Sequence, residues 1–171
     1  MGHRVSTIGH MDIDPPLNDA EFGYLTAFGE TRRWARAEGE FFVPMGPFGM
    51  DEEETLDRTA DYSRTPDAQP GLWCPWVPAG RGDCIVVRED GTDGKNYGIE
   101  PWLGYLITTF LQPGARALGV PGFESFTFDH DVSGVIATHR GDDGAFSLIR
   151  AGGGRVWSET VRRGDVPPWM S

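Results

Sequence analysis

Three residues near the N-terminus have the side chains and the spacing that a divalent metal site needs. His10, Asp12 and Asp14 alternate with apolar residues, and a spacing of two along a strand puts all three side chains on one face. An imidazole and two carboxylates are sufficient ligands for a divalent cation with open positions. His130, which lies between two Asp residues in a later predicted strand, is the candidate fourth ligand. One interpretation of the sequence is therefore a small metal-dependent hydrolase, in which the ion activates a water.

The same spacing also has an ordinary explanation. A strand with one face in water carries polar residues at alternate positions whatever its function, and Asp14 stands before Pro15 and Pro16, where turn chemistry alone favours Asp. No other His, Ser or Cys has the spacing of a nucleophile or base with its partners. Outside the metal hypothesis we therefore expect no catalytic residue and no cofactor.

The two cysteines, Cys74 and Cys84, lie ten residues apart on neighbouring predicted strands. They could face one another across a hairpin. Two thiols alone do not make a zinc site, and a structural disulfide is rare in the cytoplasm. Packed, reduced thiols are the ordinary expectation, and a redox pair or a share of a metal site is the alternative.

Four tryptophans are candidate partner-binding residues. Trp73 and Trp76 differ by an odd number of positions, so a regular strand would bury one and expose the other. Trp157 lies in a predicted strand, and Trp169 lies in the Pro-rich C-terminal segment. An exposed Trp near Arg is typical of a protein-binding anchor. The alternative is that these side chains cover the second face of a sheet.

The composition limits the class of protein and of partner. The chain has 171 residues, with 26 acidic against 15 basic side chains and a formal charge of −11. This balance argues against general binding to the nucleic-acid backbone. Because no apolar run approaches the roughly 18 residues of a membrane span, we expect no membrane contact and a cytoplasmic location. A protein with a basic surface is the natural partner of so acidic a chain.

The strongest local signal is a helix start. A strand is predicted within 6–17, and Asn18 after it is a good N-cap, with Glu21 in the position that completes a capping box. A helix should therefore begin at Asp19. We expect it to end near Ala37.

A second helix and several strands follow. The helix begins at Pro101 and carries a wide apolar stripe up to Pro113. Trp102, Tyr105 and Phe128 are either part of the core or the lining of a small-molecule pocket. The segments expected to be strands are 71–79, 84–89, 126–130, 134–140, 145–150 and 155–161.

This order predicts an α+β fold with two layers, in which two helices pack on one face of an antiparallel sheet. The first elements have the βαββαβ order of a ferredoxin-like unit, and a C-terminal β-meander follows. We expect one domain over 1–171, with a short C-terminal tail at 163–171. An acidic insertion at about 39–70 carries most of the nine acidic residues between Glu38 and Asp67. It is either a solvated loop or a lid or partner-binding segment.

Three segments resemble a group of uncharacterised small actinobacterial and actinophage-type proteins. They are DIDPPLN at 12–18, QPGLWCPW at 69–76, and GFE through DH at 122–130. The resemblance implies a bacterial or phage source and supplies no catalytic residues. The sequence as a whole favours a non-catalytic binding or regulatory protein that acts through protein–protein contacts, with the metal-dependent hydrolase as the alternative.

Overall fold

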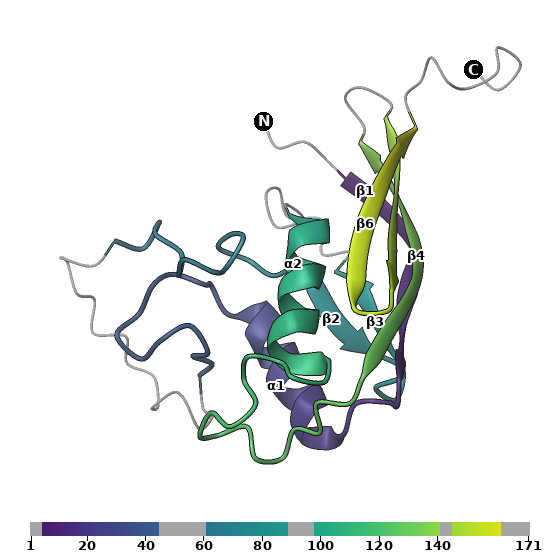
Figure 1. Cartoon of the computed structure of the whole chain (residues 1–171). Helices are drawn as coiled ribbons and strands as arrows, with labels where there is room; N and C mark the ends of the chain where they lie inside the picture. The colour runs from purple at the N-terminus through teal and green to yellow at the C-terminus, as the bar shows by residue number, and fades with distance from the viewer. Residues whose placement is uncertain (1–4, 45–60, 89–97, 141–144, 162–171) are drawn as a thin grey trace, which may run out of the picture.

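The structure is a computed structural model, and it describes residues 5–44, 61–88, 98–140 and 145–161. Figure 1 shows one β-sheet with both helices on the same side of it. The described chain is of the α+β class, as the sequence predicts. The helices are α1 (Asp19–Glu30) and α2 (Ile99–Leu106), and α2 continues into a π-helical segment, η1 (Ile107–Leu111).

Six strands form the sheet in the order β2-β3-β1-β4-β5-β6, and every neighbouring pair is antiparallel. The two longest strands, β1 and β4, pair along their whole length at the centre. The strands are β1 (Val5–Asp14), β2 (Trp76–Ala79), β3 (Cys84–Val87), β4 (Asp131–Arg140), β5 (Phe146–Gly152) and β6 (Arg155–Val161).

Alternate residues of the central strands point to opposite faces of the sheet. Met11 and Ile13 of β1 are buried, and so are Val132 and Ile136 of β4. Their immediate neighbours in each strand point the other way and are exposed or half-buried. One face of the sheet therefore carries the core, and the other has no helix over it in the described part of the chain (Figure 1).

The start of α1 confirms the predicted capping box. The backbone N–H of Glu21 donates to Asn18 Oδ1 at 2.9 Å, and the backbone N–H of Asn18 donates to Glu21 Oε1 at 2.9 Å. These two bonds satisfy donors that a helix start otherwise leaves free. The short-range pattern was sufficient here because the whole motif lies within four residues.

The predicted end of this helix at Ala37 is wrong, since α1 ends at Glu30. The chain after it bonds to a distant segment instead of to its own preceding turn. Arg33 N–H donates to Leu72 O at 2.7 Å, and Ala35 N–H donates to Arg64 O at 2.7 Å. Tertiary hydrogen bonds therefore replace the helical ones.

Aromatic side chains form a second packing layer on the side of the helices away from the sheet. The irregular segments 31–44 and 112–130 supply part of this layer. Tyr24 contacts Phe123 at 5.2 Å and Phe110 at 5.3 Å between ring centroids. The other rings in mutual contact are Phe28, Phe41, Trp102, Tyr105, Phe126 and Phe128.

Two predicted strands differ from those observed. Residues 126–130 are not part of any described strand, and the backbone of Phe128 has a positive φ of 50°, although Phe126 and Phe128 are both buried like alternate residues of a strand. Their alternation with polar residues imitates a strand. The strand predicted over 71–79 begins only at Trp76, so Trp73 lies before it.

The two ends of the predicted acidic insertion pack on the domain. Gln69 is buried, and its Nε2 donates to Glu40 O at 2.7 Å and to Tyr105 OH of α2 at 3.0 Å. Residues 45–60, with the acidic run at 51–54, lie outside the described residues, as does the tail at 163–171. Neither helix within the described ranges has the length and apolarity needed to cross a membrane.

Replacing the central ring of the aromatic layer should destabilise the fold strongly. Phe110 is fully buried, so Phe110→Ala should lower the free energy of unfolding by about 3–5 kcal/mol through lost burial and the cavity left behind. Leu118, which is 58% exposed, provides the control, because Leu118→Ala should change it by less than about 0.5 kcal/mol. Urea denaturation measures both, and equal losses would contradict this assignment of the core.

Candidate functional site

The helix-free side of the sheet carries most of the exposed apolar residues. Five of the six large apolar side chains that are exposed in the described chain lie on this side, which we call the open face. They are Ile8 (78% exposed), Phe146 (46%), Trp157 (43%), Val135 (42%) and Val161 (36%). The sixth, Leu118, lies in the irregular segment after η1.

Strand register brings these residues together across four strands, because residues directly opposite one another share a face. Ile8 is opposite Ala137, which is opposite Leu148. The row next to the row of Ile8 runs from His139 through Phe146 to Val161. The rings of His139 and Phe146 lie 4.7 Å apart.

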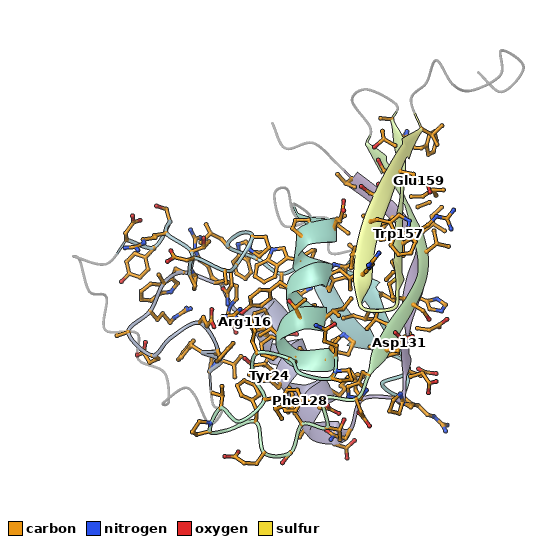
Figure 2. The ribbon with its side chains drawn as sticks, in the orientation of Figure 1. Tyr24, Arg116, Phe128, Asp131, Trp157 and Glu159 are labelled. Atoms are coloured by element: carbon orange, nitrogen blue, oxygen red, sulfur yellow. The ribbon has the colours of Figure 1, made fainter. Side chains whose placement is uncertain are left out.

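The row on the other side is mixed. Val135 is opposite Arg150, which is opposite Trp157. Arg150 Nε also lies 3.8 Å from Glu159 Oε1. In Figure 2, Trp157 and Glu159 lie along β6, far from Tyr24 and from the layer of irregular segments. The open face thus carries apolar side chains among polar ones, with a Trp beside an Arg.

The predicted His10, Asp12 and Asp14 lie at one end of the open face. All three are exposed, and His10 Nε2 is 3.0 Å from Asp12 Oδ1. Asp14 is directly opposite Asp131, so that two carboxylates meet across β1 and β4. In the described residues no group of three or more His, Cys, Asp or Glu is arranged to hold a metal ion.

His130 does not join them, contrary to the metal hypothesis. It is only 2% exposed and precedes β4. Its side chain bonds to the start of α1 on the covered side of the sheet, whereas His10 and Asp12 point to the open face. The predicted strand parity around His130 is wrong because residues 126–130 are irregular.

His130 instead forms a buried ion pair with Glu21, the residue that caps α1. Its Nε2 lies 2.7 Å from Glu21 Oε2, and its Nδ1 lies 2.6 Å from the carbonyl oxygen of Pro15. Glu21 is fully buried. Both ring nitrogens face acceptors, an arrangement that favours the doubly protonated, positively charged ring. Thr127 completes the surroundings, since its N–H donates to Glu21 Oε2 at 3.2 Å.

This pairing shifts both pKa values in the direction of the charged forms. Burial by itself lowers the pKa of His130, but the bonds to Glu21 and to the Pro15 carbonyl outweigh it and raise that pKa above 6.5. Burial by itself raises the pKa of Glu21, and the bonds from His130, Asn18 and Thr127 outweigh it and lower that pKa below 4.5. Asp129, whose Oδ1 is 3.8 Å from His130 Nε2, also favours the charged imidazole.

The role of this pair is structural. Neither nitrogen of His130 is directed to solvent, and each is occupied by an acceptor of the chain itself. A buried charge pair is expensive to break, because removing one partner leaves the other charge uncompensated. The pair joins the turn at Pro15, the start of α1 and the segment before β4.

The predicted tryptophans have different environments. Trp76 is in the core, with 1% exposure and its Nε1 donating to Ile99 O at 2.8 Å, so its assignment to partner binding is wrong. Trp73 is half-buried and Trp157 is exposed on the open face. Trp169 lies outside the described residues.

Cys74 and Cys84 are both free thiols. Cys74 is buried, and burial raises the pKa of its thiol to about 12, which keeps it protonated and unreactive. Trp102 and Tyr105, considered above as a pocket lining, are buried and in ring contact with Phe28. They are part of the core.

A buried arginine is a feature that the sequence analysis missed. Arg33 is 1% exposed, and its Nη1 and Nη2 donate to the carbonyls of Phe42 and Glu40 at 2.6 and 2.7 Å. Its guanidinium lies 4.0 Å from the centroid of Phe28. Burial lowers its pKa to about 10, so it stays charged at neutral pH and holds the segment around Phe42 against the helices.

No family model, curated protein or solved structure matches this chain. The chemistry of the described residues therefore carries the functional argument: an apolar open face with an acidic end, and a buried ion pair that fixes the turn at that end.

The ion pair should make stability depend on pH in both directions. Above pH 6.5 the unfolded chain loses the His130 proton while the folded chain keeps it, so this contribution is lost as the pH rises through the raised pKa. Below pH 4.5 the unfolded chain protonates Glu21 first, and the contribution is lost as the pH falls through the lowered pKa. The pair thus stabilises most between these values.

Thermal unfolding of His130→Gln as a function of pH tests this. The variant should be less stable by about 3 kcal/mol near pH 6 and should lack the fall on the alkaline side. If His130→Gln does not fold, the double variant His130→Gln with Glu21→Gln replaces it, because it leaves no uncompensated charge. His10→Gln, at an exposed position, is the control. An alkaline fall of the same size in wild type and in His130→Gln would contradict the charged pair.

Proposed function

We propose that this is a non-catalytic binding or regulatory protein of a bacterium or its phage, and that the open face contacts a protein partner. The observation that carries the proposal is the gathering of Ile8, Val135, Phe146, Trp157 and Val161 on a face that no described element covers. The resemblance of the segments at 12–18, 69–76 and 122–130 supports the source.

The composition of this surface supports a protein partner. Exposed apolar residues are common singly, but contiguous rows of them are typical of interaction sites. Trp and Arg are the residues that most often carry binding energy at the centre of an interface, and Trp157 lies opposite Arg150 in the mixed row. The rows contain aliphatic and aromatic side chains, which suits an apolar surface on the partner.

Charge indicates the chemistry of that partner. Asp14 and Asp131 lie directly opposite one another, and Asp12 is two residues along on the same face. Like charges opposite each other destabilise a sheet, and a cationic partner would relieve this repulsion. The formal charge of −11 also favours a cationic partner, at longer range. The proposed partner therefore has an apolar patch bordered by Lys or Arg.

The fold suits this role. We propose that the first four strands and the two helices form a ferredoxin-like unit, which the order β2-β3-β1-β4 with antiparallel neighbours supports. The order of the complete sheet is longer, because β5 and β6 follow β4. These added strands widen the face that the helices leave uncovered and contribute Phe146, Trp157 and Val161 to it.

The test is a partner isolated with the tagged full chain and then rebuilt from purified components. Trp157→Ala should weaken binding about thirtyfold, corresponding to about 2 kcal/mol at an interface anchor. Leu118→Ala removes an apolar side chain of similar exposure elsewhere and should leave the dissociation constant unchanged.

A charge variant provides a second test in the same binding experiment. Asp131→Asn should slow association and reduce its sensitivity to salt, because a charge at the border of an interface acts mainly on the rate of encounter. Binding that is unaffected by Trp157→Ala and Asp131→Asn, or repeated isolation with no stoichiometric partner, would exclude the open face as the contact surface.

A further inference from the structure

The sheet has two edge strands that differ in how well they are protected. β2 has only four residues and includes Pro78, which has no N–H to offer. β6 has seven residues, none of them Pro. Within the described residues β6 pairs with β5 alone. A long, regular edge of this kind is a template for another strand.

The turn between β5 and β6 determines which backbone groups lie along the free edge. Gly153 and Gly154 have φ of +60° and +77°, and they join the facing residues Gly152 and Arg155. These are the angles of a two-residue type I′ hairpin, in which the flanking pair exchanges both hydrogen bonds. Arg155 and every second residue after it therefore bond towards β5.

The residues between them turn their N–H and C=O groups to the outer edge. These residues are Val156, Ser158 and Thr160. Val156 is half-buried and packs on the core from the covered face of the sheet, whereas Ser158, Glu159 and Thr160 are exposed. The described core therefore leaves the C-terminal half of this edge accessible.

We propose that β6 pairs antiparallel with β6 of a second copy of this chain, about a two-fold axis at Trp157. Two six-stranded sheets then become one continuous sheet. The proposal stands on the edge geometry and does not depend on the proposed function of the open face.

The sequence of β6 selects this axis among the possible ones. The outward N–H and C=O groups allow axes at Trp157, Ser158 and Glu159, because each of these places outward residues opposite one another. With the axis at Trp157, Arg155 lies opposite the partner's Glu159, and the same ion pair forms again on the other side of the axis.

The other two axes lack this complementarity. An axis at Ser158 places Arg155 opposite the partner's Val161 and leaves Glu159 opposite an indole. An axis at Glu159 places two carboxylates directly opposite each other, which destabilises a strand pair. With the axis at Trp157 the two indoles meet, and facing aromatic residues stabilise a strand pair.

Pairing of this kind would also join the two open faces. Trp157 lies on the open face in the row with Val135 and Arg150, and the axis continues that row into the second copy. The dimer would therefore present one wide apolar surface with two acidic ends, placed symmetrically about the two indoles.

Sedimentation equilibrium of the full chain over a range of concentrations tests the pairing. We expect a reversible dimer with twice the mass of the chain. Ser158→Pro removes an N–H that points to the free edge and should abolish the dimer, while the fold, checked by circular dichroism, is kept. Ser158→Ala retains that N–H and should still dimerise.

A charge exchange tests the axis. Arg155→Glu and Glu159→Arg should each weaken dimerisation roughly tenfold, because each places like charges opposite one another twice. The double variant restores opposite charges only for the axis at Trp157 and should recover most of the wild-type affinity. A wild-type chain that stays monomeric, a dimer that survives Ser158→Pro, or a double variant that is no better than the singles would each overturn the proposal.

Discussion

A carboxylate and an imidazole, both withdrawn from water, hold together three segments that are far apart in the sequence. Glu21 satisfies the first turn of α1 with one oxygen and binds His130 with the other. His130 in turn fixes the carbonyl of Pro15, just after β1, and stands directly before β4. The end of one central strand and the start of the other are thus held at the same point. Removing either partner would leave the other as an uncompensated buried charge beneath the sheet.

The rest of the architecture follows from where the aromatic residues pack. Tyr24, Phe110 and Phe123 contact one another on the side of the helices away from the sheet, so the irregular segments become a covering layer. The sheet receives its cover from one side only. The exposed apolar rows on its other side are consequently not a defect of packing. They are the part of the apolar surface that no described element covers, and this is the surface on which the proposed contact rests.

Local patterns predicted local structure, and distant contacts decided the rest. The cap of Asn18 and Glu21 spans four residues and was predicted correctly, whereas the bond between Glu21 and His130 joins residues 109 positions apart. No spacing in the sequence signals it. Phe126 and Phe128 alternate with polar residues like a strand, but ring contacts of Phe126 with Tyr24 and Phe110, not ladder bonds, hold that segment.

The predictions for individual side chains were correct only in part: of Trp73 and Trp76, one was expected in the core, and Trp76 is buried, whereas Trp73 is half-buried instead of exposed. The parity argument for Trp73 and Trp76 assumed one regular strand, and β2 begins only at the second of them. Ile8 predicts a strand and does lie in β1, but the sequence alone does not reveal that its side of β1 is the uncovered one. The burial of the tryptophans and the exposure of Ile8 both depend on which elements pack against the sheet.

The π-helical segment η1 has a consequence for how the length of this chain can vary between relatives. Gln112 N–H donates to Ile107 O, five residues back, at 3.1 Å, which is the geometry of one residue added to an α-helix. A relative lacking one residue there would have an uninterrupted helix, with everything after the gap rotated by about 100°. Phe110 and Leu111 would then leave their places in the core. A one-residue deletion at this point is therefore an evolutionary step that requires compensating changes in the rings around it.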